Sequence, residues 1–171
     1  VIDDLEMQKT QLEHAMGRSS NGSSDWKIFT NPTKGSSNIG ASYLAYAQTP
    51  EMNLGAGFYS GPQSVEISST EPNSTIYYSL NGYLPNNGST EYTGVLSLES
   101  TKIVKAIVVS NNSEILPSFI SFNTYFINES HSLPVLSTSA DALTTLLNGN
   151  QSLRPHGTIE YFDIDGNRKD A

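Results

Sequence analysis

Turn-forming residues recur about every 8 to 12 residues between residue 54 and residue 127, and this spacing constrains the fold more than any other feature of the chain. The segments between the turns are short and alternate polar with apolar residues. In Ser64–Ser68, for example, this alternation directs Val65 and Ile67 to one face, which we expect to be the inner face. Short alternating strands with frequent turns are typical of a two-layer, all-β domain.

The clearest strand in this segment is Ile76–Leu80, which places alternate apolar side chains on one face. Asn81-Gly82 follows it as a hairpin pair, because both residues tolerate positive φ. In 102–109 the same alternation predicts Val104, Ala106 and Val108 on one side of a strand and Lys105 on the other. Together these patterns predict a mainly β protein with an immunoglobulin- or fibronectin-like β-sandwich of about seven strands.

The two flanks are expected to contain fewer elements. After the sandwich we predict one short helix near 139–147, with Ser139 as its N-cap and Gly149 as its end. We expect Asp165-Gly166 to form a turn. Outside the sandwich the predicted strands are Trp26–Phe29, 133–137, 158–164 and a short strand at Val1, Ile2 and Leu5.

Composition excludes several classes of partner. The net charge is −8, and lysine and arginine are not clustered, so binding to nucleic acid or to an anionic membrane is not expected. No apolar run approaches the roughly 20 residues that span a bilayer. The first residues lack the features of a signal peptide and do not begin with Met, and we therefore expect the chain to be an excised part of a longer protein.

No catalytic or cofactor motif is recognisable. The chain has no cysteine, no Gly-x-Ser-x-Gly, no phosphate-binding loop and no His-Glu-x-x-His. His14, His131 and His156 are far apart in sequence, and Asp163–Gly166 lacks the other ligands of a calcium loop, so it is interpreted as a plain turn. We therefore predict that the chain is not an enzyme and that it has no cofactor and no metal site.

Tyrosines are the remaining candidates for ligand binding. Tyr59, Tyr77 and Tyr83 lie near turns or on a face that we expect to point outward. An exposed ring can stack on the C–H face of a sugar. Tyr78 and Tyr92 are instead interpreted as half-buried core or corner residues.

A set of short motifs runs through the whole sandwich segment. These motifs are Gly57-Phe58-Tyr59, Ile76-Tyr77-Tyr78, Gly82, Pro85, Tyr92-Thr93-Gly94, Val104-Lys105-Ala106 and Tyr125. With them the segment resembles the C-terminal domain of chitobiases and β-hexosaminidases, which implies an immunoglobulin-like fold and no catalytic role. Asn81 and Val95 depart from the usual Asp and Pro of that family, which argues against a carboxylate-based ligand role for the turn at Asn81.

Two further resemblances concern the flanks. Met16-Gly17-Arg18, Asp25-Trp26 and Asn31-Pro32-Thr33 are similar to the end of a lamin-tail domain. Leu133-Pro134-Val135, Arg154-Pro155 and Glu160–Asp163 are similar to the start of a spore-coat-H-like (CotH) kinase domain, before its catalytic core. The predicted organisation is a lamin-tail-like end at 1–39, a linker at 40–53, the chitobiase-C-terminal-like sandwich at 54–127 and a kinase-like start at 128–171. The apolar residues of 43–47 have two interpretations, an edge strand or a bridge between domains.

These resemblances imply a non-catalytic structural or spacer region of a bacterial exported or cell-surface protein, whose signal peptide is not in this chain. Its partners would be the flanking domains of the same protein, with polysaccharide as a further candidate. One alternative is a carbohydrate-binding accessory module. Another is a fragment of a CotH-like protein kinase whose catalytic core lies beyond this chain.

Overall fold

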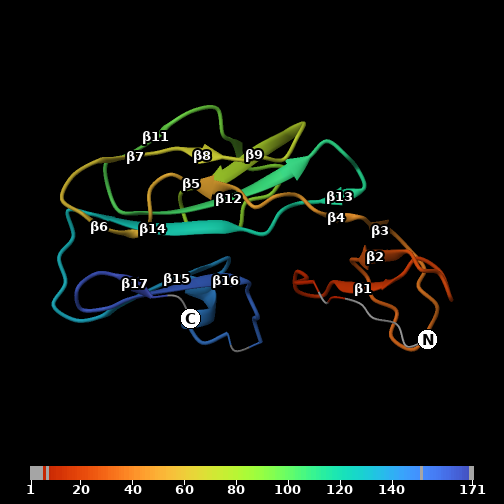
Figure 1. Ribbon diagram of the computed structural model, residues 1–171. Coiled ribbons are helices and arrows are strands. Elements are labelled where there is room, and N and C mark those ends of the chain that lie inside the picture. The colour runs from red at the N-terminus through yellow and green to blue at the C-terminus, as the bar shows by residue number, and fades with distance from the viewer. Residues whose placement is uncertain (1–5, 7, 151, 170–171) are drawn as a thin grey trace.

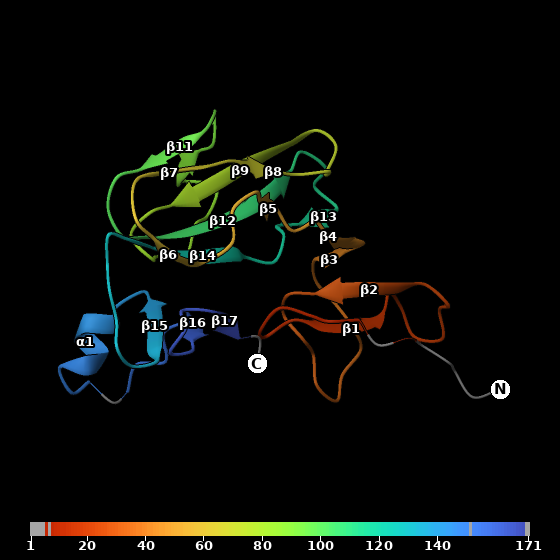
Figure 2. The ribbon, with the colours of Figure 1, turned by 60° about the vertical axis from the view of Figure 1, so that its left-hand side comes forward.

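The computed structural model describes residue 6, residues 8–150 and residues 152–169 (Figure 1). The protein is mainly β, as predicted, with several sheets and one short helix in the described part of the chain. A central β-sandwich carries two smaller sheets, one from each flank. Both small sheets lie on the same side of the sandwich, below β14 in Figures 1 and 2.

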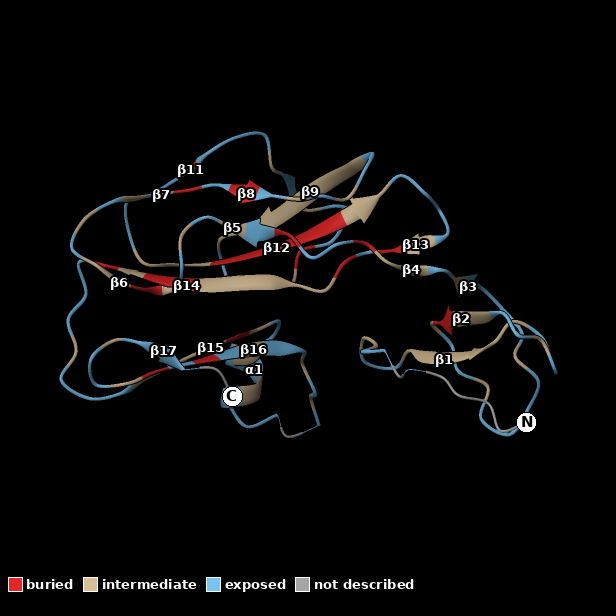
Figure 3. Cartoon of the chain, in the orientation of Figure 1, coloured by how far each residue is buried: buried red, intermediate tan, exposed pale blue. Residues whose placement is uncertain are grey.

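The larger layer of the sandwich is a five-stranded sheet in which β14 and β6 are parallel and the other pairs are antiparallel. Its longest strand, β12, has a central run of five buried residues, visible in Figure 3. The order across the sheet is β10 (Thr90–Glu91), β9 (Ser74–Ser79), β12 (Lys102–Ser110), β14 (Ser121–Ile127) and β6 (Gly57–Tyr59).

The second layer is built from two short ladders, β11 (Leu96–Leu98) with β7 (Gln63–Val65) and β5 (Glu51–Met52) with β8 (Ile67–Ser68). Val65 and Ile67 are buried, which confirms their predicted inward orientation. They pack in one cluster with side chains of the larger layer. The buried members of this cluster are Val65, Ile67, Leu96, Leu98, Val104, Ala106, Tyr125 and Ile127.

The outer face of the larger layer is also covered. Lys105 lies opposite Val104 and Ala106, as the alternation predicts, yet its side chain is completely buried. The reason is the small C-terminal sheet, which packs on this outer face. The buried run 104–108 of β12 is therefore apolar on both faces except at Lys105.

The C-terminal sheet has the order β15 (Val135–Ala140), β16 (Gly157–Phe162) and β17 (Arg168–Lys169), with α1 (Leu143–Leu147) between the first two. The short helix is confirmed, but the predicted N-cap is wrong. Ser139 lies in β15, where its hydroxyl bonds that of Thr158 at 2.8 Å, and the N-cap position is taken by Ala142. Pairing with β16 prevailed over the capping preference of serine.

The N-terminal sheet consists of β1 (Ala15–Arg18), β2 (Trp26–Phe29) and β3 (Ser42–Tyr43). It is followed by β4 (Ala45–Tyr46), which pairs in parallel with β13 (Ile115–Leu116) of the sandwich. Residues 42–52 thus pack as edge strands. The strand expected at Val1, Ile2 and Leu5 lies outside the described residues.

The turn after β9 differs from the expected hairpin. Gly82 has positive φ (78°), but Asn81 does not, and it forms an isolated bridge with Ile103 instead. The partner strand of β9 begins only at Thr90, after a loop over 80–89. In this loop Asn81 uses its side chain as an acceptor for the amide of Tyr83, at 3.1 Å. The side chain of Asn81 thus stabilises a local turn, and this turn forms in place of the two-residue hairpin.

Gly82→Ala is expected to lower stability by about 1 to 3 kcal/mol. A Cβ at this position would lie 2.8 Å from the Cβ of Ser139, and the backbone φ of 78° disfavours any other L-residue. Chemical denaturation measures the effect. Gly94→Ala is the matched control, because a Cβ there contacts nothing within 4 Å. Equal stability of the two variants would contradict the close approach of Gly82 to Ser139.

Candidate functional site

The three predicted tyrosines do not form one site. Tyr59 lies at the edge of the sandwich, where its hydroxyl donates to the carbonyl of Gly55 at 2.6 Å and its ring contacts Tyr125. Tyr77 lies on the outer face of β9, between β10 and β12. Tyr83 lies in the loop over 80–89 and is 55% exposed. Among the described residues, no ring contact joins any two of these three.

Tyr83 borders a cleft of about 830 Å³. The cleft lies between the loop over 80–89, the start of β12 and the residues that precede α1. Most of its lining side chains carry hydroxyl, amide or charged groups. The lining residues are Tyr78, Ser79, Leu80, Asn81, Tyr83, Leu84, Asn86, Ser89, Thr90, Lys102, Asp141 and Ala142.

Short hydrogen bonds fix the shape of this cleft. The hydroxyl of Ser79 donates to the carbonyl of Tyr83 at 2.6 Å. The amide of Leu84 donates to Oδ1 of Asp141 at 3.1 Å, across 57 residues of sequence. Asp141 therefore links the C-terminal flank to the loop that carries Tyr83. Within the described part of the chain, its Oδ2 accepts no hydrogen bond, so it can still accept one from a ligand.

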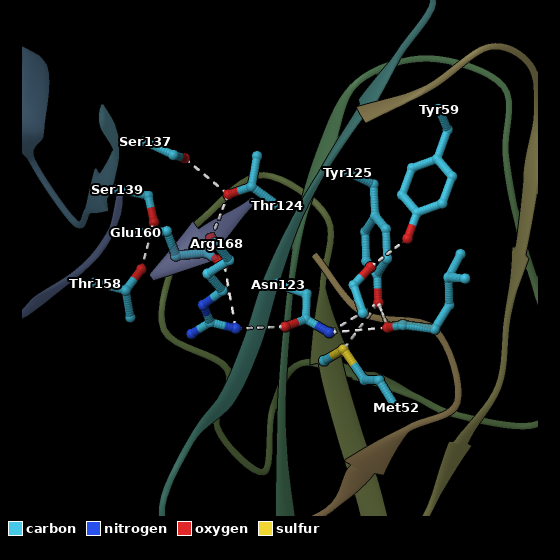
Figure 4. Close-up of polar contacts among 12 residues, drawn as sticks. Met52, Tyr59, Asn123, Thr124, Tyr125, Ser137, Ser139, Thr158, Glu160 and Arg168 are labelled. Atoms are coloured by element: carbon cyan, nitrogen blue, oxygen red, sulfur yellow. Dashed lines mark hydrogen bonds and ion pairs between the residues drawn. The ribbon is translucent and has the colours of Figure 1, made fainter. Parts of the chain in front are cut away.

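A second polar cluster lies between the sandwich and the C-terminal sheet (Figure 4). The carboxylate of Glu160 is 3% exposed. Its Oε2 accepts a hydrogen bond from the hydroxyl of Thr124, which also bonds Ser137 at 2.7 Å. Its Oε1 lies 3.5 Å from Nη1 of Arg168, which donates to Asn123 at 2.9 Å. Residues of both sheets thus contribute to one buried network.

This network continues into the core of the sandwich. The side-chain amide of Asn123 donates to the hydroxyl of Tyr125 at 3.0 Å and to the carbonyl of Leu54. Burial raises the pKa of Tyr125 to about 12, so its hydroxyl keeps its proton at neutral pH. That hydroxyl donates to the carbonyl of Leu54 at 2.7 Å. Tyr125 is therefore a structural donor that ties β14 to the second layer.

Lys105 borders the same interface. Its Nζ donates to the carbonyl of Ser139 at 3.4 Å. Burial lowers the pKa of Lys105, and the nearby carboxylates of Asp141 and Glu160 oppose part of this effect. Burial therefore disfavours the protonated form of Lys105, and the two carboxylates favour it.

Aromatic contacts complete the interface. Phe162 of β16 is fully buried and meets Phe58 and Phe126 of the sandwich edge to face, with ring centroids 5.8 and 5.3 Å apart. His131 packs against Phe58 at 4.2 Å. This explains His131 as a packing residue. His14 has a similar role in the N-terminal flank, where its ring stacks on Tyr46.

The turn at Asp163–Gly166 forms as predicted, with positive φ (79°) at Gly166. Asp163 accepts from the amides of Asp165 and Asn167 and forms an ion pair with Lys169 at 2.8 Å. These contacts lower the pKa of the Asp163 carboxyl. In the described part of the chain, no group of three potential metal ligands occurs.

Sequence reasoning missed Lys105, Glu160, Arg168 and Asp141. Lys105 and Glu160 each interrupt an otherwise apolar stretch, Ile103–Val109 and Ile159–Phe162. A single charge inside such a strand was the available signal. The polar/apolar alternation within a strand does not predict which residues of different segments contact each other.

Lys105→Met is expected to raise the melting temperature at pH 7, because it removes a buried cation while Arg168 still faces Glu160. A protonated lysine whose pKa is lowered by folding costs stability below that pKa, and the cost disappears as pH rises toward 10.5. The gain from Lys105→Met should therefore shrink with increasing pH. Thermal unfolding at pH 7 and pH 10 measures this.

Lys34→Met is the control, because Lys34 lies in an exposed loop. It should change the melting temperature little at either pH. A lower melting temperature for Lys105→Met at pH 7 would mean that the charge of Lys105 is required by Glu160, in contradiction to this interpretation.

A family model described as the chitobiase/beta-hexosaminidase C-terminal domain matches residues 54–116. The match covers just over a third of the chain and confirms the resemblance for that segment, an immunoglobulin-like module. No curated protein and no solved structure matches the chain. In the described residues, no helix has the length and apolar character needed to cross a membrane. The resemblances of the two flanks stay predictions.

Proposed function

We propose that this chain is a non-catalytic, structural region of a bacterial exported or cell-surface multidomain protein. Its central sandwich would hold two flanking domains in a fixed relative orientation. The observation that carries the proposal is the buried network around Glu160, which joins the sandwich to the C-terminal sheet. The proposed domains are a lamin-tail-like end at 1–39, a linker at 40–53, the sandwich at 54–127 and a kinase-like start at 128–171.

The C-terminal contact has the properties of a fixed interface. It combines the buried ring of Phe162 with directional hydrogen bonds from Thr124 and Arg168. The guanidinium of Arg168 also lies over the ring of Phe122, 5.3 Å from its centre. Apolar burial favours docking in general, whereas buried hydrogen bonds favour one particular orientation.

The N-terminal contact is smaller and less buried. The side chain of Gln11 donates to the carbonyls of Pro117 and Ser118, at 3.1 and 3.0 Å. Tyr46 accepts from the amide of Gln11 and packs against Phe119. We therefore expect the N-terminal flank to be held less firmly than the C-terminal flank.

The outer face of the C-terminal sheet carries exposed apolar side chains that a partner domain could cover. Leu136, Ile159 and Tyr161 lie on this face and are 61, 67 and 44% exposed. Adjacent exposed apolar residues are typical of surfaces that other protein elements cover. This supports the proposal that a flanking domain of the same protein packs here.

Glu160→Ala is expected to weaken docking of the C-terminal sheet by about 1 to 3 kcal/mol, because the buried hydroxyl of Thr124 would lose its carboxylate acceptor and Arg168 would lose its ion-pair partner at this interface. Hydrogen exchange of the amides in 135–140 and 157–162 measures docking. Asp163→Ala is the control, since it removes an ion pair with Lys169 at the far turn. Unchanged exchange in Glu160→Ala would rule out a fixed orientation that depends on this network.

Carbohydrate binding is a second candidate function, and the cleft beside Tyr83 is the observation that favours it. An exposed ring next to hydroxyl, amide and carboxylate groups suits a ligand that has both C–H faces and many hydroxyls. The cleft contains one cation, Lys102, and one anion, Asp141, so its charges balance. This arrangement favours a neutral saccharide over a phosphorylated ligand.

Tyr83→Ala is expected to weaken binding to a neutral polysaccharide about tenfold or more, measured as loss of retardation in affinity gels. Tyr77→Ala, which the sequence also predicted to reduce binding, now serves as the comparison, because Tyr77 does not line the cleft. Equal retardation of wild type and Tyr83→Ala would exclude the cleft as the binding site.

A further inference from the structure

The cleft beside Tyr83 is built from two parts of the chain that fold as separate sheets. Ten of its twelve lining residues come from the sandwich segment, and Asp141 and Ala142 come from the C-terminal flank. Asp141 reaches the cleft because β15 is docked on the outer face of the sandwich. Undocking the C-terminal sheet would therefore remove one wall of the cleft together with Asp141, the only carboxylate among its described lining residues.

The contacts that place this wall are close. The carboxylate of Asp141 accepts from the amide of Leu84, next to Tyr83 in the loop over 80–89. In the same loop, Gly82 is so close to Ser139 that a Cβ added to Gly82 would lie 2.8 Å from the serine Cβ. Ala142 has a φ of 54°, in the left-handed region that alanine rarely adopts. The chain thus follows an unfavourable path between β15 and α1, and Asp141 lies on that path.

The chemistry of this wall matters for a saccharide. Of the two oxygens of Asp141, Oδ1 is used by Leu84. No hydrogen bond is made to Oδ2 among the described residues, and a carboxylate oxygen is a strong acceptor for a hydroxyl. The sandwich part of the lining supplies Tyr83 and the side-chain amides of Asn81 and Asn86. A neutral sugar bound between the walls would contact both parts of the chain.

We propose that a neutral oligosaccharide binds in this cleft only when the C-terminal sheet is docked, so that saccharide binding and docking stabilise each other. The proposal rests on carbohydrate binding as the second candidate function. Because linkage is reciprocal, a saccharide that needs the docked state must also favour that state. If only a fraction of molecules is docked, the apparent affinity falls by that fraction.

The test uses the full chain with two probes, the β-1,4-linked trimers of N-acetylglucosamine and of glucose. Isothermal titration calorimetry gives the affinity, and hydrogen exchange of 135–140 and 157–162 gives the docking. In wild type, a saturating probe should increase the protection of these strands. Glu160→Ala, which changes no residue of the cleft, should weaken binding at least tenfold if it leaves no more than about a tenth of the molecules docked.

Asp141→Asn tests whether Asp141 contacts the saccharide, as distinct from its part in docking. It keeps an acceptor for Leu84 but removes the negative charge that also acts on Lys105, so exchange of 135–140 and 157–162 is measured first without saccharide. When affinities are compared at the same docked fraction, we expect binding about tenfold weaker, because a donor replaces a carboxylate oxygen. Full affinity in this variant would overturn the role of Asp141 as a ligand-contacting wall.

The outcomes are distinguishable. Binding of a probe without added protection of β15 and β16, or with the same affinity in an undocked Glu160→Ala, would overturn the coupling and leave carbohydrate binding by the sandwich intact. Binding of neither probe to wild type at millimolar concentration would overturn carbohydrate binding itself, and this proposal with it.

Discussion

The structure depends on the burial of two opposite charges between the sandwich and the C-terminal sheet. Removing a charge from water costs several kcal/mol, and the cost is recovered only when partners lie in suitable positions. Glu160 meets this condition in part, because Oε2 accepts from Thr124, whereas the buried Oε1 has an ion pair with Arg168 and no hydrogen bond. Lys105 has one long hydrogen bond, to the carbonyl of Ser139. Because an apolar contact alone would tolerate sliding of the two sheets, the buried charges select the observed register.

This selection has consequences for the sandwich itself. A free sandwich would expose the outer face of β12 and β14, where Ile107 is two residues from Lys105 along β12 and Phe122 is paired with Lys105 across the two strands. The C-terminal sheet covers the part of that face around Lys105, Thr124 and Phe126. The remaining part forms an apolar groove of about 640 Å³ that includes Ile107, Phe119 and Phe122. The N-terminal segment borders the groove at its far side. The outer face of the five-stranded sheet thus contacts the C-terminal flank and borders the N-terminal flank.

The sequence predicted those features that depend on local order. Alternation in 64–68 and 102–109 identified the inner faces correctly, because a strand has a period of two residues. The candidate site was predicted only in part. Tyr83 lies in a cleft, but Asp141 reaches it from 57 residues away along the chain. The N-cap predicted at Ser139 failed for the same reason, because its long-range pairing with Thr158 outweighed a local preference. Contacts between distant segments have no periodicity that a pattern could report.

The loop over 80–89 connects these observations. It is long because Asn81 caps its own turn instead of closing a two-residue hairpin, and the additional length carries Tyr83 and Leu84 to the edge of the docked sheet. Gly82 then permits the approach of Ser139, since only a residue without Cβ fits there. The match to the chitobiase/beta-hexosaminidase C-terminal domain ends at residue 116 and does not include the docked sheet. The family match therefore does not describe the contact between the two parts, and any function of the cleft must be sought in the two segments together.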